Sequence, residues 1–174
     1  MRKFLIAVLL GISISAAAQQ PKPVATLKTV LLQELRETHN EKGWFVSEKE
    51  AVAGLTPEQA AWSDGKNHSV GQLVQHLNFW NSANLARLRH QSAPKVTDND
   101  TTFAFDAAQW DSALKEFERV MGELEQFVES ADDATLAKIA PTVARIAQHN
   151  AYHIGEMVTS RKKQGTWNPE SGVK

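Results

Sequence analysis

The residues best suited to chemistry in this sequence are three histidines. His149 and His153 are four residues apart, and on a helix such residues lie one above the other on the same face. Two imidazoles in this arrangement can bind one metal ion, and His76 is the best candidate for a third ligand. Three histidines with one position left open are typical of a catalytic metal site. The alternative is that His149 and His153 only pack or face solvent.

Other catalytic and metal sites lack their characteristic motifs here. A di-iron bundle needs Glu-x-x-His pairs, and no histidine follows a glutamate at that spacing. A zincin needs His-Glu-x-x-His, but Asn150 follows His149. The sequence has no Gly-x-Ser-x-Gly elbow, no glycine-rich phosphate loop and no cysteine for a thiolate site. A mononuclear site with three histidine ligands remains.

Glu156 is the candidate catalytic residue. It lies about one helical turn beyond His153, on the same flank. Its carboxylate can be a fourth ligand, a partner that orients a ligating histidine, or a general base for water at the metal. The alternative is an exposed helical glutamate without a role in chemistry.

Several other residues have weaker claims to a functional role. Trp80 and Arg87 share a flank of one predicted helix with the third histidine and could line a pocket. Core packing is nevertheless favoured for Trp80, and solvent exposure for Arg87. For Tyr152, packing is favoured over catalysis, and a hydrogen bond to a neighbouring helix is the alternative. His39 and His68 lie at element ends, where capping or surface positions are expected.

The elements that position these residues are predicted to be helices, because apolar residues recur at intervals of three and four. The long helices are expected from about Val24 to Gly43, from Ser69 to about His90, from Asp106 to about Val128, and from Pro141 to Gln164. In the first of them, the expected core positions are Leu27, Val30, Leu31 and Leu35.

Capping boxes that begin at Ser47 and Thr56 predict short extra helices between the first and second long helices. No strand pattern and no internal repeat are evident. The sequence therefore predicts an all-α four-helix bundle. Each candidate ligand lies on the flank of its helix, so the site requires the second and fourth long helices to be neighbours. The sequence does not give their packing order.

The amino-terminal segment has the features of an export signal. Arg2 and Lys3 precede an apolar run, residues 4–14, and Ala16 and Ala18 fit an A-x-A cleavage site. We therefore expect residues 1–18 to be a signal peptide and residues 19–174 to form one domain in the periplasm or outside the cell. The apolar run is short for a membrane span, although a retained anchor is the alternative.

Composition narrows the range of partners. The net charge is −1 at pH 7, which gives no reason to expect nucleic acid or an anionic membrane. The absence of cysteine suits an oxidising compartment. We expect a small-molecule substrate or ligand and no membrane span after signal removal, and a homodimer is left open.

The segment His149-Asn-Ala-Tyr-His-Ile-Gly-Glu156 resembles the His-x-x-Tyr-His-x-Gly-Gln motif of the DinB-like superfamily, which is unrelated to the lesion-bypass polymerase of that name. Residues 54–62 and 68–77 resemble the segments that lead into and carry the first metal histidine of the family. The resemblance implies a four-helix bundle with a metal ion on His76, His149 and His153. Known members include thiol-dependent transferases and isomerases. Two departures are Glu156, where glutamine is frequent, and the export signal, which argues against a cytosolic thiol as co-substrate.

The function expected from these observations is that of an exported, metal-dependent hydrolase or group transferase. A divalent ion on three neutral imidazoles keeps its charge and can polarise a substrate oxygen. The alternatives are a bundle that binds metal or a ligand without turnover, and a structural protein whose histidines have lost their role. Zinc or nickel is favoured as the ion, with iron or copper as alternatives.

Overall fold

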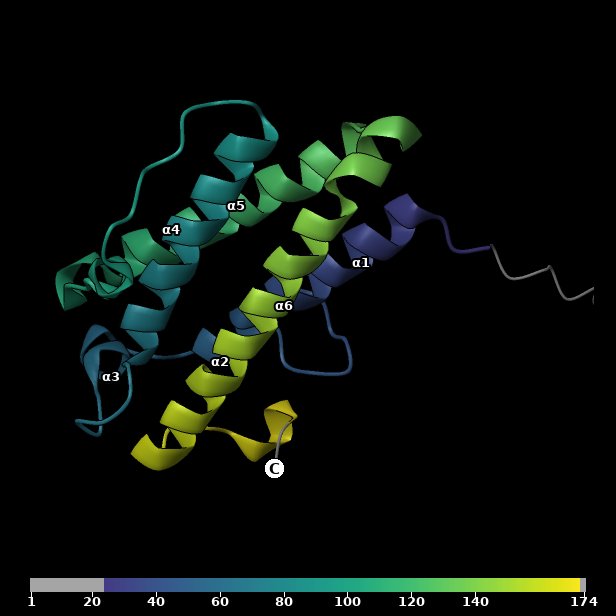
Figure 1. Cartoon of the computed structure of the whole chain (residues 1–174). Coiled ribbons are helices and arrows are strands. Elements are labelled where there is room, and N and C mark those ends of the chain that lie inside the picture. Colours follow the sequence, from purple (N-terminus) through teal and green to yellow (C-terminus); the bar gives the residue numbers. More distant parts are fainter. Residues whose placement is uncertain (1–23, 173–174) are drawn as a thin grey trace, which may run out of the picture.

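The computed structural model describes residues 24–172, and the predicted signal segment, residues 1–18, lies outside them. Four long helices form a bundle, and within the described range no residue is in a strand (Figure 1). The long helices are α1 (Leu27–His39), α4 (Val70–Leu88), α5 (Trp110–Ser130) and α6 (Asp133–Gln164). The shorter helices are α2 (Glu48–Val52), α3 (Pro57–Ala61), η1 (Asn99–Phe103), η2 (Ala107–Gln109) and η3 (Pro169–Ser171). The expected all-α bundle with short helices between the first two long ones is confirmed.

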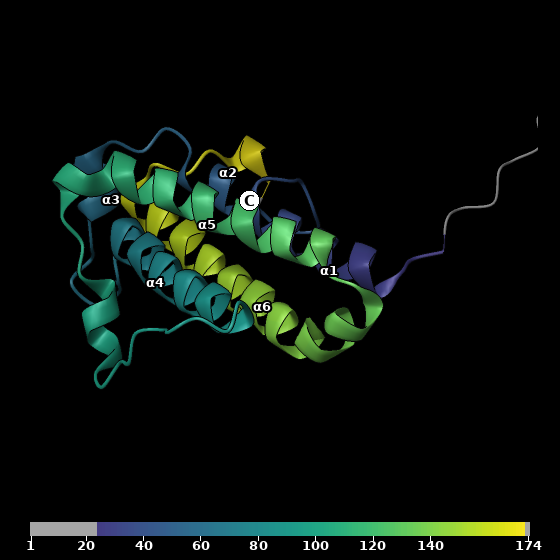
Figure 2. The same ribbon diagram turned by 90° about the horizontal axis from the view of Figure 1, so that it is seen from above.

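The packing order of the long helices satisfies the condition on which the candidate site depends. Helix α6 packs against α1 and α4, while α5 packs against the other sides of the same two helices. Helices α4 and α6 are therefore neighbours and lie side by side in Figure 2, while the packing pairs place α5 and α6 at opposite corners of the bundle. The flanks of α4 and α6 that carry the three candidate ligands can face each other.

A long connection between α4 and α5 also shapes the site. The two helices run parallel, since Asn78 Nδ2 in the middle of α4 donates to the Ala113 carbonyl in the first turn of α5, and Arg89 at the end of α4 pairs with Glu123 further along α5. Residues 89–109 must then return along the bundle before α5 begins, and this crossover is visible beside α4 in Figure 1. The crossover contains η1, which packs against α4.

Local sequence signals set most of the helix ends. Reciprocal capping bonds join Thr56 to Gln59 and Ser69 to Gln72, as predicted. Ser47 caps α2 by accepting from the Glu50 amide. Gly165 ends α6 with φ 79°, a left-handed conformation that glycine adopts at little cost.

Two helix starts differ from the prediction. Helix α6 begins at Asp133, with Asp132 as its cap, and continues through Pro141 rather than beginning there. Leu136 and Ile139 are buried, so tertiary packing outweighs the backbone hydrogen bond that proline removes. Asp106 caps the short η2, and α5 follows from Trp110 without a side-chain cap of its own.

The apolar face of α1 also differs from the prediction. Leu31, Leu32 and Leu35 are buried, but Leu27 and Val30 are 44% and 43% exposed. Helical periodicity alone does not show which apolar residues of a helix its neighbours cover. No helix within residues 24–172 is long and apolar enough to cross a membrane.

Candidate metal centre

The three predicted histidines converge between α4 and α6. His149 Nε2 lies 3.2 Å from His76 Nε2 and 3.0 Å from His153 Nε2. Bonds of 2.0–2.1 Å to one ion at tetrahedral angles imply separations of roughly 3–4 Å, and the observed distances lie at the short end of that range. Together these side chains could hold a metal ion, and they are the one such group among the described residues.

In two of the histidines, the hydrogen-bond partner of the nitrogen that faces away from the cluster fixes which ring nitrogen is protonated. Thr102 Oγ1 lies 2.6 Å from His76 Nδ1 and donates its own proton to the Asn99 carbonyl. It must therefore accept a hydrogen bond from His76 Nδ1. Glu156 Oε2 lies 2.7 Å from His153 Nδ1 and likewise accepts from it. In both histidines the Nε2 lone pair is left free for a metal ion.

The environment keeps two histidines of the cluster, His76 and His149, uncharged. His76 and His153 are 3% and 7% exposed, and His149 is half-buried. Burial, together with the other histidines, lowers the pKa of His76 to about 3. Burial and His153 lower the pKa of His149 to about 4. At neutral pH these two imidazoles are neutral, which is the form that binds metal.

Helix η1 supplies a wall of the site that the sequence did not indicate. The Phe103 ring stacks on His76 with centroids 4.0 Å apart, and His68 stacks on the other face of Phe103 at 3.8 Å. Thr102 and Phe103 lie in a polar connection with no helical periodicity, so only the return path of the crossover places them beside α4. His68 is exposed, as expected for a residue at an element end.

The cluster opens onto a groove of about 800 Å³ between α4, α6 and η1. Trp80 and Tyr152 line it, which differs from the packing roles expected for both. Trp80 is half-buried and donates from Nε1 to Asn99, while Tyr152 is 64% exposed with its ring against His153. Arg87 is exposed, as expected, and also lines the groove. The open groove gives small molecules a route to the histidines.

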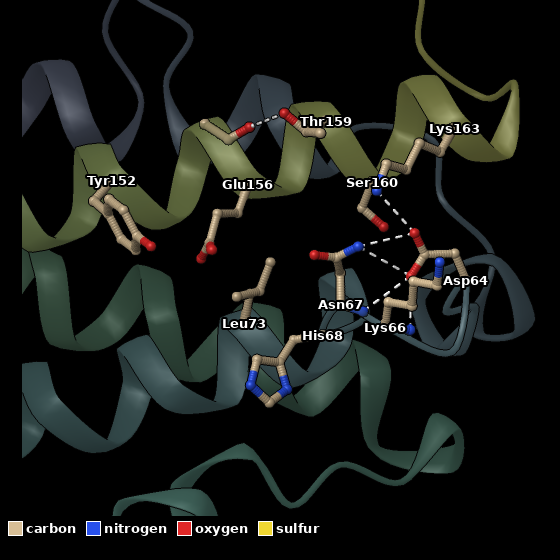
Figure 3. A pocket seen from close by; sticks show the side chains of 11 residues that line it. Asp64, Lys66, Asn67, His68, Leu73, Tyr152, Glu156, Thr159, Ser160 and Lys163 are labelled. Carbon is tan, nitrogen blue, oxygen red and sulfur yellow. Dashed lines mark hydrogen bonds and ion pairs between the residues drawn. The ribbon is translucent and has the colours of Figure 1, made fainter.

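Glu156 faces a second, smaller cavity of about 380 Å³ on the other side of Tyr152. Figure 3 shows its side chain extending from α6 toward Leu73 and His68, with the Lys163–Asp64 ion pair at the far wall. Of the three roles considered for Glu156, its contact with His153 Nδ1 favours the orientation of a ligand. Glu156 is not among the residues that line the groove.

His39 has a different environment from the one expected at a helix end. It is 2% exposed, and its two ring nitrogens lie 2.7 Å from Glu125 and 2.9 Å from Glu118. Burial opposes protonation, but the two carboxylates outweigh it and raise the pKa of His39. With both nitrogens engaged by carboxylates, His39 serves the packing of α1 against α5 rather than the metal cluster.

Comparison with known families identifies the chain. The family model of the DinB superfamily matches residues 49–157, well over half of the chain and all three histidines. The chain belongs to the DinB superfamily. The resemblance inferred from the motif 149–156 is thus confirmed. No curated protein and no solved structure gave a significant match.

Proposed function

We propose that this member of the DinB superfamily is a metal-dependent hydrolase or group transferase that acts on a small molecule. The observation that carries the proposal is the convergence of three Nε2 atoms next to an open groove. A structural or storage site would be closed by protein ligands, whereas catalytic sites keep a position accessible to substrate.

The residues present fit a divalent ion. All three donors are imidazole nitrogens, two with lowered pKa values and two with the tautomer fixed by Thr102 or Glu156. A bound ion would supply Lewis acidity toward a substrate oxygen or water. Imidazole ligands favour zinc or nickel, and iron or copper are also compatible.

The second candidate function is binding of metal or ligand without turnover. It is favoured by one observation: none of the residues described as lining the groove is an aspartate or glutamate. Glu156, the candidate general base, is engaged with His153 Nδ1. A general base must reach the proton that it removes, so an active enzyme would need Glu156 to turn or would use Lewis acidity alone.

We also propose that the protein is exported, with cleavage after Ala18. The support is the charged, apolar and small-residue order of the first 18 residues. Mass spectrometry of the protein secreted from an expressing bacterium would show the new amino terminus at Gln19. A chain that retains Met1 in the cytoplasm would contradict export.

The decisive experiment is elemental analysis of the mature protein, purified without an affinity-tag metal, beside His153→Ala. We expect one divalent ion per chain in the wild type and none in the variant. The circular dichroism of the variant should stay helical, because alanine has the higher helix propensity. Unfolding of His153→Ala would instead mean that the residue is mainly a packing element.

Turnover separates the two candidate functions. The metal-loaded wild type would be tested on a panel of small esters, amides and phosphoesters, with Glu156→Gln as the comparison. If Glu156 acts as a general base, its loss should lower the rate by about 10²–10⁴. Equal rates would leave it only the orienting role, and no turnover on the panel would favour the binding protein.

A further inference from the structure

The groove that leads to the three histidines carries only positive charge. Arg87 from α4 and Arg145 from α6 both line it, and no described residue in its lining is acidic. The histidines add no negative charge, and a divalent ion bound to them would add two positive charges. An anion that enters this groove meets no negative charge in the described lining, and the two arginines attract it.

These two arginines differ from the other four within residues 24–172. Arg36, Arg89 and Arg119 form ion pairs with glutamates, and Arg161 donates to backbone carbonyls. Arg87 instead donates to the neutral amide of Asn84, and Arg145 forms no ion pair with any described carboxylate. Both side chains are exposed at the groove, so their guanidinium groups are free to bind an oxyanion.

The positions of the arginines set the length of a suitable ligand. Arg145 precedes His149 by four residues on α6, which corresponds to roughly 6 Å along the helix. Arg87 follows His76 by eleven residues on α4, or roughly 16 Å. Helices α4 and α6 are antiparallel here, since Asn81 bonds Asn150 one turn from the cluster and Arg87 shares the groove with Thr142. Both arginines therefore lie toward the same end of the groove.

The part of the groove between the histidines and the two arginines is lined by apolar and aromatic side chains. Trp80 is held by its bond to Asn99, and the Arg87 guanidinium lies 5.8 Å from its ring centroid. Phe103 and Ile146 complete this part of the lining. Such a surface favours hydrocarbon or a ring over a second charge.

We propose that the substrate or ligand is an elongated organic anion. Its carboxylate or phosphate binds Arg87 and Arg145, its apolar middle lies along Trp80, and its reacting polar group reaches the three histidines. The inference rests on the proposed function for the identity of the reacting end. The inference that the other end of the ligand is an anion rests only on the charges of the groove.

The test is calorimetric titration with three linear probes of equal chain length: suberate, 7-phosphonoheptanoate and octanediamide. Wild type would be compared with Arg87→Gln and Arg145→Gln. The matched control is Lys115→Gln, which removes an exposed cation on α5 away from the groove. Each protein is titrated with zinc bound and after chelator treatment, and its metal content is measured.

We expect both anionic probes to bind the wild type more tightly than octanediamide does. Each arginine variant should weaken anion binding by about 3- to 10-fold, as for partly exposed charged hydrogen bonds, while octanediamide binding and Lys115→Gln stay unchanged. After chelation, the tighter of the two anions tells a carboxylate preference of the arginines from a phosphonate preference. Equal binding of the diamide and the anions, or arginine variants equal to wild type, would overturn the proposal.

The two metal states separate this inference from the proposed function. If the arginines hold the anion, the ratio of the anion dissociation constants of the arginine variants to that of the wild type persists after chelation. A protein that never binds metal would refute the metalloenzyme while leaving this ratio intact. A metal-loaded protein without the ratio would refute the inference while leaving the metal centre intact.

Discussion

At the scale of single residues, the metal cluster depends on two side chains that do not touch the proposed ion. Thr102 and Glu156 each accept from the Nδ1 of one histidine. These bonds hold the ring in one orientation and keep the proton away from Nε2. Thr102 comes from the crossover and Glu156 from α6. Neither residue is among those that line the groove.

We therefore predict that Thr102→Val and Glu156→Ala each weaken zinc binding by about 10- to 100-fold, the usual effect of losing such a partner. Glu156→Gln keeps an oxygen that can accept from His153 and should bind zinc within a few-fold of wild type. Affinity would be measured by competition with a chromophoric chelator. Wild-type affinity in Thr102→Val would show that His76 needs no external orientation.

A second prediction concerns pH. The pKa values of His76 and His149 lie below the ordinary value of 6.5, at about 3 and about 4. Both rings therefore stay neutral as the pH falls from 7 to 5, and protons compete weakly with metal. Since at most one ligand proton can then compete, we expect zinc affinity to fall by at most about 100-fold over these two pH units, rather than the roughly 10⁴-fold of three ordinary imidazoles. Chelator competition at pH 5, 6 and 7 would measure it, and a three-proton dependence would contradict it.

At the scale of elements, the crossover between α4 and α5 joins the fold to the site. It must pack closely on α4 to bring Thr102 and Phe103 to His76. Gly71 allows this approach, because a Cβ at that position would collide with the Phe105 ring. Phe105 in turn packs edge-on against Trp110 at the beginning of α5.

Gly71→Ala should accordingly destabilise the protein by about 1–3 kcal/mol, the usual cost of overpacking, and should weaken zinc binding through displacement of the crossover. The control is Gly122→Ala on α5, where an added Cβ meets nothing within 4 Å. That change should stabilise by about 0.5–1 kcal/mol through helix propensity. Urea denaturation would give both values, and equal effects of the two substitutions would show that the approach of Phe105 does not restrict the residue at position 71.

At the scale of the whole molecule, ionisable groups are buried in places other than the histidine cluster between α4 and α6. One such place lies where α1, α2 and α5 meet. His39 and Glu48 are buried there, beside the exposed Glu118. Burial raises the pKa of Glu48 to about 8, although nearby His39 opposes the shift. Its Oε1 has no hydrogen-bond partner among the described residues.

The sign of the resulting pH dependence follows from proton uptake. Between about pH 4.5 and pH 8 the folded protein keeps the Glu48 proton while the unfolded chain has released it. The contribution of Glu48 to stability therefore falls as the pH rises through this window. The slope for one such group is at most about 1.4 kcal/mol per pH unit.

We predict that Glu48→Gln removes this slope and becomes progressively more stable than wild type from pH 5 to pH 8. Metal-free protein would be unfolded in urea at each pH. Glu50→Gln, an exposed site on the same helix, is the control and should follow wild type. Parallel curves for wild type and Glu48→Gln would mean that Glu48 is ionised in the folded protein.

The sequence by itself determined the fold class and the candidate ligands. Helical periodicity predicted the all-α bundle, and the spacing of His149 and His153 placed two imidazoles on one face of α6. Capping boxes at Thr56 and Ser69 and the glycine at 165 gave the ends of α3, α4 and α6. These features are local: they depend on residues within about one helical turn of each other, so the chain order contains them.

Only the tertiary structure decided what surrounds those ligands. Which helices are neighbours depends on how apolar faces combine across the bundle, and the faces alone do not specify the partner. The parallel pairing of α4 and α5 sends the crossover back past His76, which brings in Thr102 and Phe103 from a polar segment without periodicity. Helix packing likewise placed His39 between two glutamates, and it brought Arg87 and Arg145 to one groove. Contacts between residues 26 to 86 positions apart are a property of the packed chain, and no local pattern records them.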